Sequence, residues 1–520
     1  MHFYDLFYES ARNHPQRLLF TGDGGDFSYG DARSRLNRIA RQMLAEGLGN
    51  ETRFAVLSPN CGRAMISIMG CLRAGAVWCT LNLRNTPADN IQILSSGGCT
   101  VLYYHSSAEA LAQDIQSQVP TIRRVVCLDA AGPLGPFLDD WVAAQPETAP
   151  DLRVDESTLV FQGATGGTTG APKLTLSDSR ALLTVVQGWS MCLHFDDTPP
   201  VNLAVAPITH AAGMVALGQI PFGGTIVMMG TPSVDYILDA IEKRRISVLY
   251  LPPTLIYALL AHPRAASTDF SSLRYLLSAG APISPDKVVE AVKVFGPVLC
   301  QAFGQTEGGF PLTFMSPAET AAAARDPALR RRLLSCGRPT PIVEAMDCID
   351  EAGHALPADE TGELALRGPM IMRAYLNDPK TTSEIQKAGW HLTGDIGCRD
   401  ADGYIYITDR KRDMVVSGGF NIFPFEIEAV MNAHPAVQEC AVIGVPDAKW
   451  GEAVKAVVQL KPGATASEAE LIAYCKERIG SMKTPKSVDF EANLPRSPVG
   501  KVLKRELRKR YWVGQERGVS

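Results

Sequence analysis

A run rich in glycine and threonine, T-G-G-T-T-G-A-P-K at residues 165–173, could bind a phosphate. Its backbone amides can form an anion-binding concavity, with threonine hydroxyls as further donors and Lys173 as a point charge. In a P-loop the lysine directly follows a glycine, whereas Ala171 and Pro172 separate Gly170 from Lys173 here. Pro172 also removes one amide donor and disfavours a helix at Ala171. Taken alone the run also suits a flexible turn, but it is not a P-loop.

Four other segments contain residue types that could complete a nucleotide site. A-F-G-Q-T-E-G-G at 302–309 contains Glu307, and a carboxylate oxygen together with phosphate oxygens suits a hard cation. The other three are G-W-H-L-T-G-D at 389–395, D-R-K-R-D-M-V-V-S-G-G-F-N-I-F-P-F-E-I-E at 409–428 and L-P-R-S-P-V-G-K-V-L-K-R-E-L at 494–507. Taken singly, each has a plain alternative: a solvated acid at Glu307, an acid in a glycine turn at Asp395, and one charge of a basic tail at Lys501.

In this order the five segments resemble the motifs of the adenylate-forming (ANL) enzymes, which include acyl-CoA synthetases, luciferases and nonribosomal peptide adenylation domains. The resemblance extends from near residue 1 to about residue 510. Two letters depart from the common pattern. Gly166 stands where most members have serine, and Phe303 stands where many have tyrosine, so one hydroxyl is lost at each position.

The resemblance implies that the glycine-rich loop closes over the β- and γ-phosphates of ATP while the α-phosphate reacts. It also implies that Phe303 packs on adenine, that Thr306 bonds a phosphate, and that Glu307 ligates Mg²⁺. Lys501 would catalyse adenylation, and Asp395 with Arg410 would bind the ribose. The nucleotide-binding residues implied in this way are Thr165, Gly166, Gly167, Thr168, Thr169, Gly170, Lys173, Gly280, Ala281, Phe303, Gly304, Asp395 and Arg410.

A second half-reaction on coenzyme A is also implied. In the family the small domain turns about a hinge, here Arg412, and a glycine loop then lines the pantetheine tunnel. The residues of that loop are Gly418, Gly419 and Phe420. The chain is therefore expected to divide into an adenylation domain at 1–411 and a small lid domain at 412–520.

The acid is the least determined substrate. P-I-T-H-A-A-G-M-V at 207–215 corresponds to the family segment beside the acyl pocket, where His210 would gate the pocket or approach the carboxylate, unless it is a plain packed histidine. L-L-S-A-G-A-P-I at 276–283 and G-G-F at 308–310 offer small or apolar walls. These segments contain no arginine or lysine for a second carboxylate and no early acid for an ammonium group. A hydrophobic monocarboxylic acid, fatty, aryl or cyclic, is what remains.

The elements that must position these residues follow an alternating pattern. Short apolar runs alternate with amphipathic stretches over the first three-quarters of the chain, which indicates α/β layers with largely parallel sheets. The predicted strands are 54–57, 77–81, 101–104, 124–128 and 248–251, and the predicted helices are 62–74, 108–118, 234–244 and 254–261. In such folds ligands bind beyond the carboxyl ends of the strands.

The last part of the chain has a different character. Strands at 437–445, 454–460 and 487–491 with helices at 424–432 and 467–478 predict a small α+β domain, which the resemblance implies is mobile. The fold class expected is α/β: a large N-terminal domain of layered, mostly parallel sheets with flanking helices, followed by this small domain.

Composition places the chain among ordinary globular proteins. Of 520 residues, 46% are hydrophobic and 20% charged, and the net charge of −5 gives no reason to expect nucleic acid as a partner. The twelve cysteines follow no metal-binding spacing, and no secretory signal is visible, so we expect reduced thiols in the cytoplasm. The uncharged stretch 201–230 is interrupted by prolines and glycines, which favours a strand, a loop, a buried helix and a strand over a transmembrane segment. A homodimer is left open.

The sequence therefore predicts an ATP-dependent acid–CoA ligase with ATP, Mg²⁺ and coenzyme A as cofactors and co-substrates. The main alternative is an adenylate-forming enzyme that loads a carrier-protein thiol or keeps the adenylate for oxidation. A P-loop ATPase or kinase would form ADP rather than AMP and pyrophosphate. A non-catalytic binding module disagrees with the presence of Lys501, Glu307 and Asp395 together.

We expect Lys501→Ala to abolish most acyl-adenylate formation, because removing one positioned charge of this type costs on the order of 10²–10³ in rate. The same variant should still convert supplied acyl-adenylate and CoA into thioester. ATP–pyrophosphate exchange measures the first step, and Lys509→Ala in the same basic tail is the control. Unchanged exchange in Lys501→Ala would remove the catalytic assignment.

Overall fold

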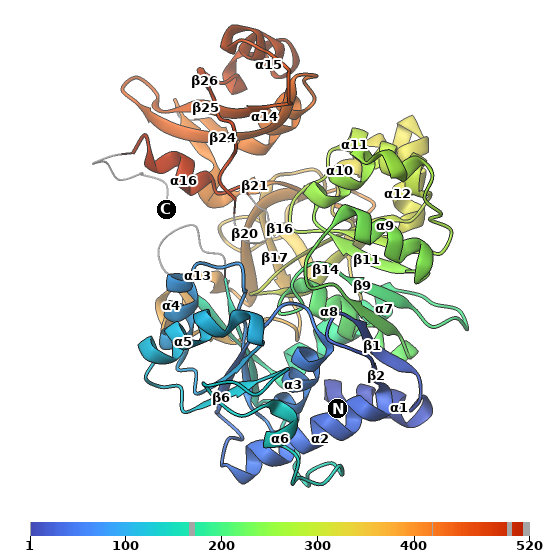
Figure 1. The fold of residues 1–520 in the computed structure, drawn as a ribbon. Helices are drawn as coiled ribbons and strands as arrows, with labels where there is room; N and C mark the ends of the chain where they lie inside the picture. Colours follow the sequence, from blue (N-terminus) through green and yellow to red (C-terminus); the bar gives the residue numbers. More distant parts are fainter. Residues whose placement is uncertain (1, 166–171, 419, 497–501, 513–520) are drawn as a thin grey trace. The chain divides into compact units, whose positions relative to one another are not determined.

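The described residues form two compact units. The computed structural model describes residues 2–165, 172–418, 420–496 and 502–512. Unit 1 contains the described residues up to 345 together with 366–386, and unit 2 contains 346–365 and the described residues from 387 onward (Figure 1). The domain division at 411 and 412, which the hinge motif suggests, stays a prediction.

A seven-stranded sheet in unit 1 contains the strands on both sides of the phosphate-loop segment. Its order is β18-β8-β7-β4-β3-β5-β6, with β7 to β6 parallel and with β8 and β18 antiparallel at one edge. The strands are β3 (Arg53–Leu57), β4 (Val77–Cys79), β5 (Val101–Tyr104), β6 (Arg124–Cys127), β7 (Leu159–Ala164), β8 (Leu174–Asp178) and β18 (Ala374–Tyr375).

Helices cover both faces of this sheet. They are α2 (Tyr29–Ala45), α3 (Gly62–Arg73), α4 (Pro87–Gly97), α5 (Glu109–Gln118) and α6 (Leu138–Trp141), with the short turn η1 (Ser106–Ala108). Leu102 and Tyr104 of β5 belong to a core with α4 and α5, whereas Tyr103 between them contacts Met43 of α2 and Cys71 of α3. All four residues of β5 are buried, as expected for a parallel strand covered on two sides.

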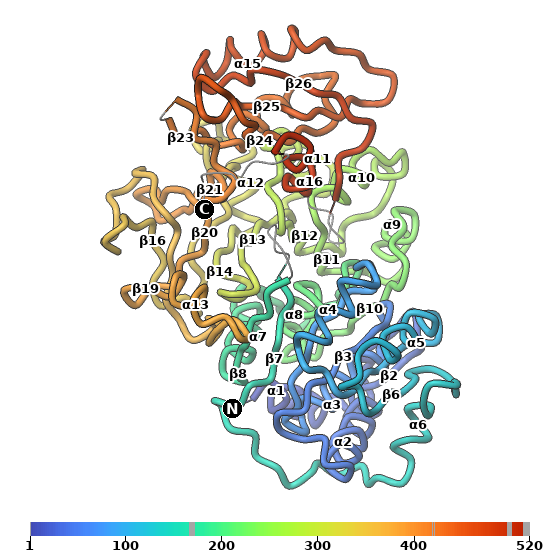
Figure 2. The backbone as a smooth tube through the Cα atoms, turned by 90° about the vertical axis from the view of Figure 1, so that its left-hand side faces the viewer, coloured from blue at the N-terminus to red at the C-terminus, as the bar shows by residue number. Residues whose placement is uncertain are grey.

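A nine-stranded sheet forms the second layer system of unit 1. Its order is β15-β14-β13-β12-β11-β9-β10-β1-β2, and the strands from β13 to β1 are parallel. The strands are β1 (Leu18–Gly22), β2 (Phe27–Ser28), β9 (Val201–Ala204), β10 (Thr225–Met228), β11 (Val248–Leu251), β12 (Tyr275–Ser278), β13 (Leu299–Gln305), β14 (Gly309–Met315) and β15 (Arg338–Pro339). The N-terminal strand β1 joins this sheet beside β10, although the two are far apart in the sequence. Figure 2 shows β11, β12 and β13 of the same sheet as neighbours.

The helices of this second system are α1 (Phe3–Asn13), α7 (Ser179–Cys192), α8 (Ala211–Leu217), α9 (Val234–Lys243), α10 (Pro253–Ala261), α11 (Pro285–Phe295) and α12 (Pro317–Arg325), with η2 (Ile220–Phe222), η3 (Pro263–Ala266) and η4 (Pro327–Leu334). The uncharged stretch 201–230 forms β9, a loop, the buried helix α8 and β10, as predicted. Among the described residues, no helix has both the length and the apolar character needed to cross a bilayer.

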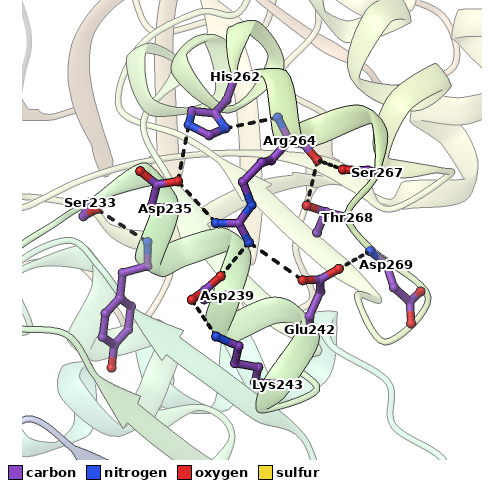
Figure 3. A network of polar contacts seen from close by, with 11 residues as sticks. Ser233, Asp235, Asp239, Glu242, Lys243, His262, Arg264, Ser267, Thr268 and Asp269 are labelled. Atoms are coloured by element: carbon purple, nitrogen blue, oxygen red, sulfur yellow. Dashed lines mark hydrogen bonds and ion pairs between the residues drawn. The ribbon is translucent and has the colours of Figure 1, made fainter.

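Arg264 in η3 ties the segment after α10 to helix α9 (Figure 3). Its guanidinium lies 3.2 Å from Asp235, 2.5 Å from Asp239 and 3.9 Å from Glu242, measured between the nearest nitrogen and oxygen atoms. His262 Nε2 lies 3.5 Å from Asp235. Single exposed ion pairs contribute little stability, so this network mainly fixes the two helices that flank β11.

Unit 2 contains most of a third sheet and all of a fourth. The third has the order β16-β17-β20-β19 with β21 beside β20, and the fourth has the order β23-β22-β25-β24 with β26 beside β25. The strands are β16 (Ala345–Ile349), β17 (Gly362–Arg367), β19 (Gln386–Lys387), β20 (Trp390–Arg399), β21 (Ile405–Arg410), β22 (Val415–Ser417), β23 (Phe420–Ile422), β24 (Val437–Asp447), β25 (Gly451–Leu460) and β26 (Ser487–Phe490). The turn η5 (Lys411–Asp413) separates the two sheets in the sequence.

Helices pack on both faces of the fourth sheet, as Figure 1 shows. They are α14 (Pro424–Asn432), α15 (Glu468–Lys483) and α16 (Lys504–Lys509). Cys440 and Val442 of β24 belong to the core shared with α14 and α15, whereas Ala441 and Ile443 belong to the core shared with α16. This alternation follows from the period of two along a strand. Both units together confirm the predicted α/β fold class, with a large N-terminal part and a smaller C-terminal one.

A buried group of charges anchors α16. Lys504 Nζ lies 2.8 Å from Glu428 Oε1 of α14, and Arg508 pairs with Asp413 of η5. Burial alone would lower the pKa of Lys504, but the carboxylates of Glu428, Asp409 and Asp413 raise it above its ordinary value. Lys504 is therefore charged, and its removal would leave Glu428 without its ion-pair partner and Asp409 without a nearby compensating charge.

We expect Lys504→Met to destabilise unit 2 by about 3–5 kcal/mol, the usual cost of breaking a buried ion pair from one side. Native-state hydrogen exchange of the amides in β24 and β25 measures this opening free energy. Lys509→Met is the matched control, because Lys509 and its partner Glu506 are exposed on the same helix. Equal exchange rates in the two variants would contradict the role of the buried charges.

Candidate active site

The phosphate-loop segment connects two strands of an antiparallel pair. Ala164 of β7 pairs with Leu174 of β8, and the Thr165 amide donates a hydrogen bond to the Lys173 carbonyl at 2.9 Å. Thr165 and Lys173 therefore close the base of a hairpin. The predicted residues Gly166, Gly167, Thr168, Thr169 and Gly170, which come between Thr165 and Lys173 in the sequence, lie outside the described residues.

Lys173 is held by the segment around α13 (Pro379–Ile385). Its Nζ lies 3.0 Å from Thr381 Oγ1 and 3.6 Å from Asp378 Oδ2, and 5.2 Å from the ring centre of Tyr375. Hydrogen bonds from Thr381 and the charge of Lys173 hold the pKa of Asp378 below its ordinary value. A phosphate bound at the hairpin would compete with Asp378 for the Lys173 ammonium.

Thr306 lies against Gly163 near the base of the same hairpin, and Glu307 is the next residue in the chain. A Cβ atom on Gly163 of β7 would lie only 2.5 Å from Thr306 Cγ2, so glycine at 163 permits the close approach. The Tyr375 hydroxyl donates a hydrogen bond to Glu307 Oε1 at 2.8 Å. The structure thus brings together Lys173, Thr306 and Glu307, as the sequence predicts.

The donor set fits Mg²⁺ bound together with a nucleotide. Glu307 offers a carboxylate and Thr306 a hydroxyl, both hard oxygen donors. Within the described part of the chain, no group of three or more His, Cys, Asp or Glu side chains could hold a metal alone.

Four further predicted nucleotide-binding residues lie at the carboxyl ends of two neighbouring parallel strands. Gly280 follows β12 with a φ of 87°, and Phe303 with Gly304 lies near the end of β13. A Cβ atom on Gly304 would lie 2.6 Å from the Gly309 carbonyl oxygen, so this position requires glycine. Phe303 is partly exposed, and Ala281 after Gly280 is exposed. The strand pairing thus brings these residues to one edge of the sheet.

His210 is the residue immediately before α8 and is partly buried. Burial lowers its pKa, so the imidazole is neutral near pH 7. The loop before it is clamped by Asn60, whose side chain bonds the carbonyls of Ala204 and Ala206 and the amide of Ile208 at 2.9–3.0 Å. Sequence reasoning did not find Asn60, because its partners lie far along the chain.

Aromatic side chains gather behind the Gly309 turn. Phe310 packs edge-to-face on Trp189 of α7 with ring centres 4.8 Å apart, and on Tyr250 of β11 at 6.1 Å. Trp189 also contacts Phe314 of β14. These contacts make the region apolar, which agrees with the small or apolar walls expected from the sequence.

Asp395 and Arg410 form an ion pair within unit 2. They lie opposite each other in the β20–β21 pair, and Arg410 Nε is 2.6 Å from Asp395 Oδ1. Asp395 is 2% exposed. The sequence assigned both residues to the ribose, and the fold brings them together from two motifs.

The glycine loop of unit 2 lies beside an exposed tryptophan. Gly418 has a φ of 59°, and its amide donates a hydrogen bond to the Trp450 carbonyl at 2.8 Å. A Cβ atom on Gly418 would lie 2.6 Å from the Trp450 ring. Phe420 and Trp450 are 53% and 42% exposed. Gly419 and Lys501 lie outside the described residues.

Comparison with known families accounts for this arrangement. The model of the AMP-binding enzymes matches residues 7–376, and that of the AMP-binding enzyme C-terminal domain matches residues 426–501. The chain belongs to the AMP-binding enzyme family. It is an adenylate-forming enzyme, and the roles that the sequence assigned to single residues stay predictions.

Relatives of this AMP-binding enzyme have comparable lengths. A medium/long-chain-fatty-acid–CoA ligase of Mycobacterium tuberculosis is 32% identical, over 98% of this chain and 90% of the relative. A feruloyl-CoA synthase of Amycolatopsis is also 32% identical, over 96% and 97%. Among solved structures, the amide bond synthetase McbA of Marinactinospora thermotolerans superposes with a TM-score of 0.87 at 28% identity, over 98% of this chain and 100% of that one.

In this AMP-binding enzyme we expect His210 to act without changing its charge above pH 6.5, because burial lowers its pKa from that value. A lowered histidine pKa means that any change of charge occurs below pH 6.5. The pH profiles of ATP–pyrophosphate exchange for the wild type and His210→Asn should therefore be parallel above that pH and differ only in amplitude. An inflection near pH 7 that His210→Asn removes would show a charged histidine instead.

Proposed function

We propose that this protein is an ATP-dependent acid–CoA ligase. A carboxylate oxygen attacks the α-phosphorus of ATP, and pyrophosphate leaves to give an acyl-adenylate. The CoA sulfur then attacks the acyl carbon, and AMP leaves. The observation that carries the proposal is the approach of Thr306 to Gly163 near the base of the glycine-rich hairpin, with the neighbouring Glu307 bonded by Tyr375.

The first step must overcome the repulsion between a carboxylate and a polyphosphate. Lys173 at the hairpin and Lys501 from the C-terminal motif would supply positive charge. Mg²⁺, when bound through Glu307, would neutralise part of the phosphate charge. The carboxylate is already ionised at neutral pH, so the attack needs no general base. Orientation of the two reactants supplies the rest of the acceleration.

Features of unit 2 favour CoA as the acceptor. Phe420 and Trp450 present exposed rings beside Gly418, and the Lys449 ammonium lies 4.6 Å from the ring centre of Trp450. Such a surface suits an apolar pantetheine arm and the phosphates of CoA. Both curated relatives described above are named for CoA thioester formation. A carrier-protein thiol is the second candidate, because it presents the same pantetheine arm.

The acid that we propose is a hydrophobic monocarboxylate. Phe310, Trp189 and Tyr250 form an apolar cluster, and the segments 207–215 and 276–283 contain no lysine or arginine. A second carboxylate would therefore be buried without a partner.

We also propose a cytoplasmic location, since no disulfide joins any of the twelve cysteines, all of which lie in described segments.

A screen of acids with ATP and Mg²⁺, with and without CoA, tests the proposal. We expect a fatty, aryl or cyclic monocarboxylic acid to give AMP, pyrophosphate and acyl-CoA, and malonate and amino acids to give little. Product identification by mass spectrometry separates AMP from ADP. Replacing CoA with a phosphopantetheinylated carrier protein tests the second candidate. The absence of acid-dependent AMP formation with every acceptor would overturn the function.

A further inference from the structure

Tyr375 holds the carboxylate of Glu307 in a defined orientation. Its hydroxyl donates to Glu307 Oε1 at 2.8 Å, and the Met372 amide donates to the Glu307 carbonyl at 2.9 Å. Tyr375 is 9% exposed, so water competes weakly for this bond. The segment 372–375 therefore fixes both the backbone and the side chain of Glu307.

The position of Tyr375 is set by β8, the second strand of the hairpin, with which β18 pairs. Tyr375 lies opposite Thr175 in the β18–β8 pair, and its amide donates a hydrogen bond to Thr382 Oγ1 at 3.0 Å. The Lys173 ammonium lies 5.2 Å from the centre of its ring, within the range of a cation–π contact. Tyr375 is thus the physical link between the hairpin base and Glu307.

A carboxylate has two oxygens, and Tyr375 engages only one of those of Glu307. A tyrosine hydroxyl also donates a hydrogen bond without adding positive charge, so the carboxylate keeps its full attraction for a cation. We propose that Tyr375 is a positioning residue that orients Glu307 so that its other oxygen meets the divalent cation of the bound nucleotide. This proposal depends on the proposed function, in which Glu307 ligates that cation.

Tyr375→Phe removes the hydroxyl and keeps the ring under Lys173. Mn²⁺ replaces Mg²⁺ as an observable probe, and α,β-methylene-ATP replaces ATP because it cannot release pyrophosphate. Titration followed by electron paramagnetic resonance gives the Mn²⁺ dissociation constant of the enzyme–nucleotide complex. We expect Tyr375→Phe to raise it roughly five- to tenfold, the scale of the net contribution of one intramolecular hydrogen bond, with unchanged affinity for the metal-free nucleotide.

Tyr406→Phe is the matched control. Tyr406 is similarly buried at 7% exposure and donates to a carboxylate, Asp400 Oδ2, at 2.8 Å in the third sheet. The Tyr406→Phe variant should leave the Mn²⁺ affinity of the enzyme–nucleotide complex unchanged. A double-mutant cycle with Glu307→Gln then separates orientation of the carboxylate from general loosening. If Tyr375 acts through Glu307, Tyr375→Phe adds no further loss in the Glu307→Gln background.

Two results would overturn the proposal while leaving the proposed function intact. One is an equal Mn²⁺ affinity in the wild type and Tyr375→Phe, and the other is a full additional loss in the Glu307→Gln background. If the wild type binds no Mn²⁺ with α,β-methylene-ATP, both the proposal and the proposed function are overturned. The binding measurement uses neither acid nor CoA, so an unidentified acid does not affect it.

Discussion

The repulsion between an acid and a polyphosphate is the constraint on which the arrangement of this protein depends. An adenylate-forming enzyme must hold two anions in contact at reacting distance and must exclude water from the product. Positive charge, hydrogen-bond donors and a cation have to converge on the phosphates from different parts of the chain. Unit 1 meets part of this need where the hairpin base, the end of β13 and the segment before α13 come together.

Sheet geometry makes that convergence possible. Parallel strands place their carboxyl ends at a common edge, so the segments after β12 and β13 emerge side by side. Glycine at 163 and 304 then lets neighbouring backbone and side chains approach more closely than any other residue would permit. In unit 2 a different geometry applies, because the antiparallel pair β20 and β21 places Asp395 directly opposite Arg410.

Periodicity and motifs predicted much of this from the sequence. The strand Val101–Tyr104 and the helix Pro424–Asn432 have the predicted bounds, because apolar residues and a proline at a helix start are strong local signals. The strand predicted at 77–81 ends at Cys79, and that predicted at 454–460 begins at Gly451, since strand ends depend on pairing partners. The helix expected to end at Arg478 continues to Lys483, although Gly480 interrupts its helical geometry with a φ of 74°.

The sequence could not predict contacts that join distant segments. Tyr375 meets Glu307 only because β18 pairs with β8, and no local pattern shows that pairing. Asn60 clamps the loop before His210 from another sheet, and Trp450 packs on Gly418 from a loop outside the quoted motifs. Asparagine and tyrosine have many roles in proteins, so residue type alone did not identify Asn60 and Tyr375 as residues near the site. The buried charges around Lys504 likewise looked like an ordinary basic tail.

The most direct test of the account follows an oxygen atom. If the carboxylate attacks the α-phosphorus, an acid labelled with ¹⁸O at both carboxylate oxygens transfers one label to AMP when CoA takes the acyl group. Mass spectrometry of AMP and pyrophosphate after one turnover gives the answer. The account predicts AMP with a single ¹⁸O and unlabelled pyrophosphate. Unlabelled AMP, or label in the pyrophosphate, would contradict it.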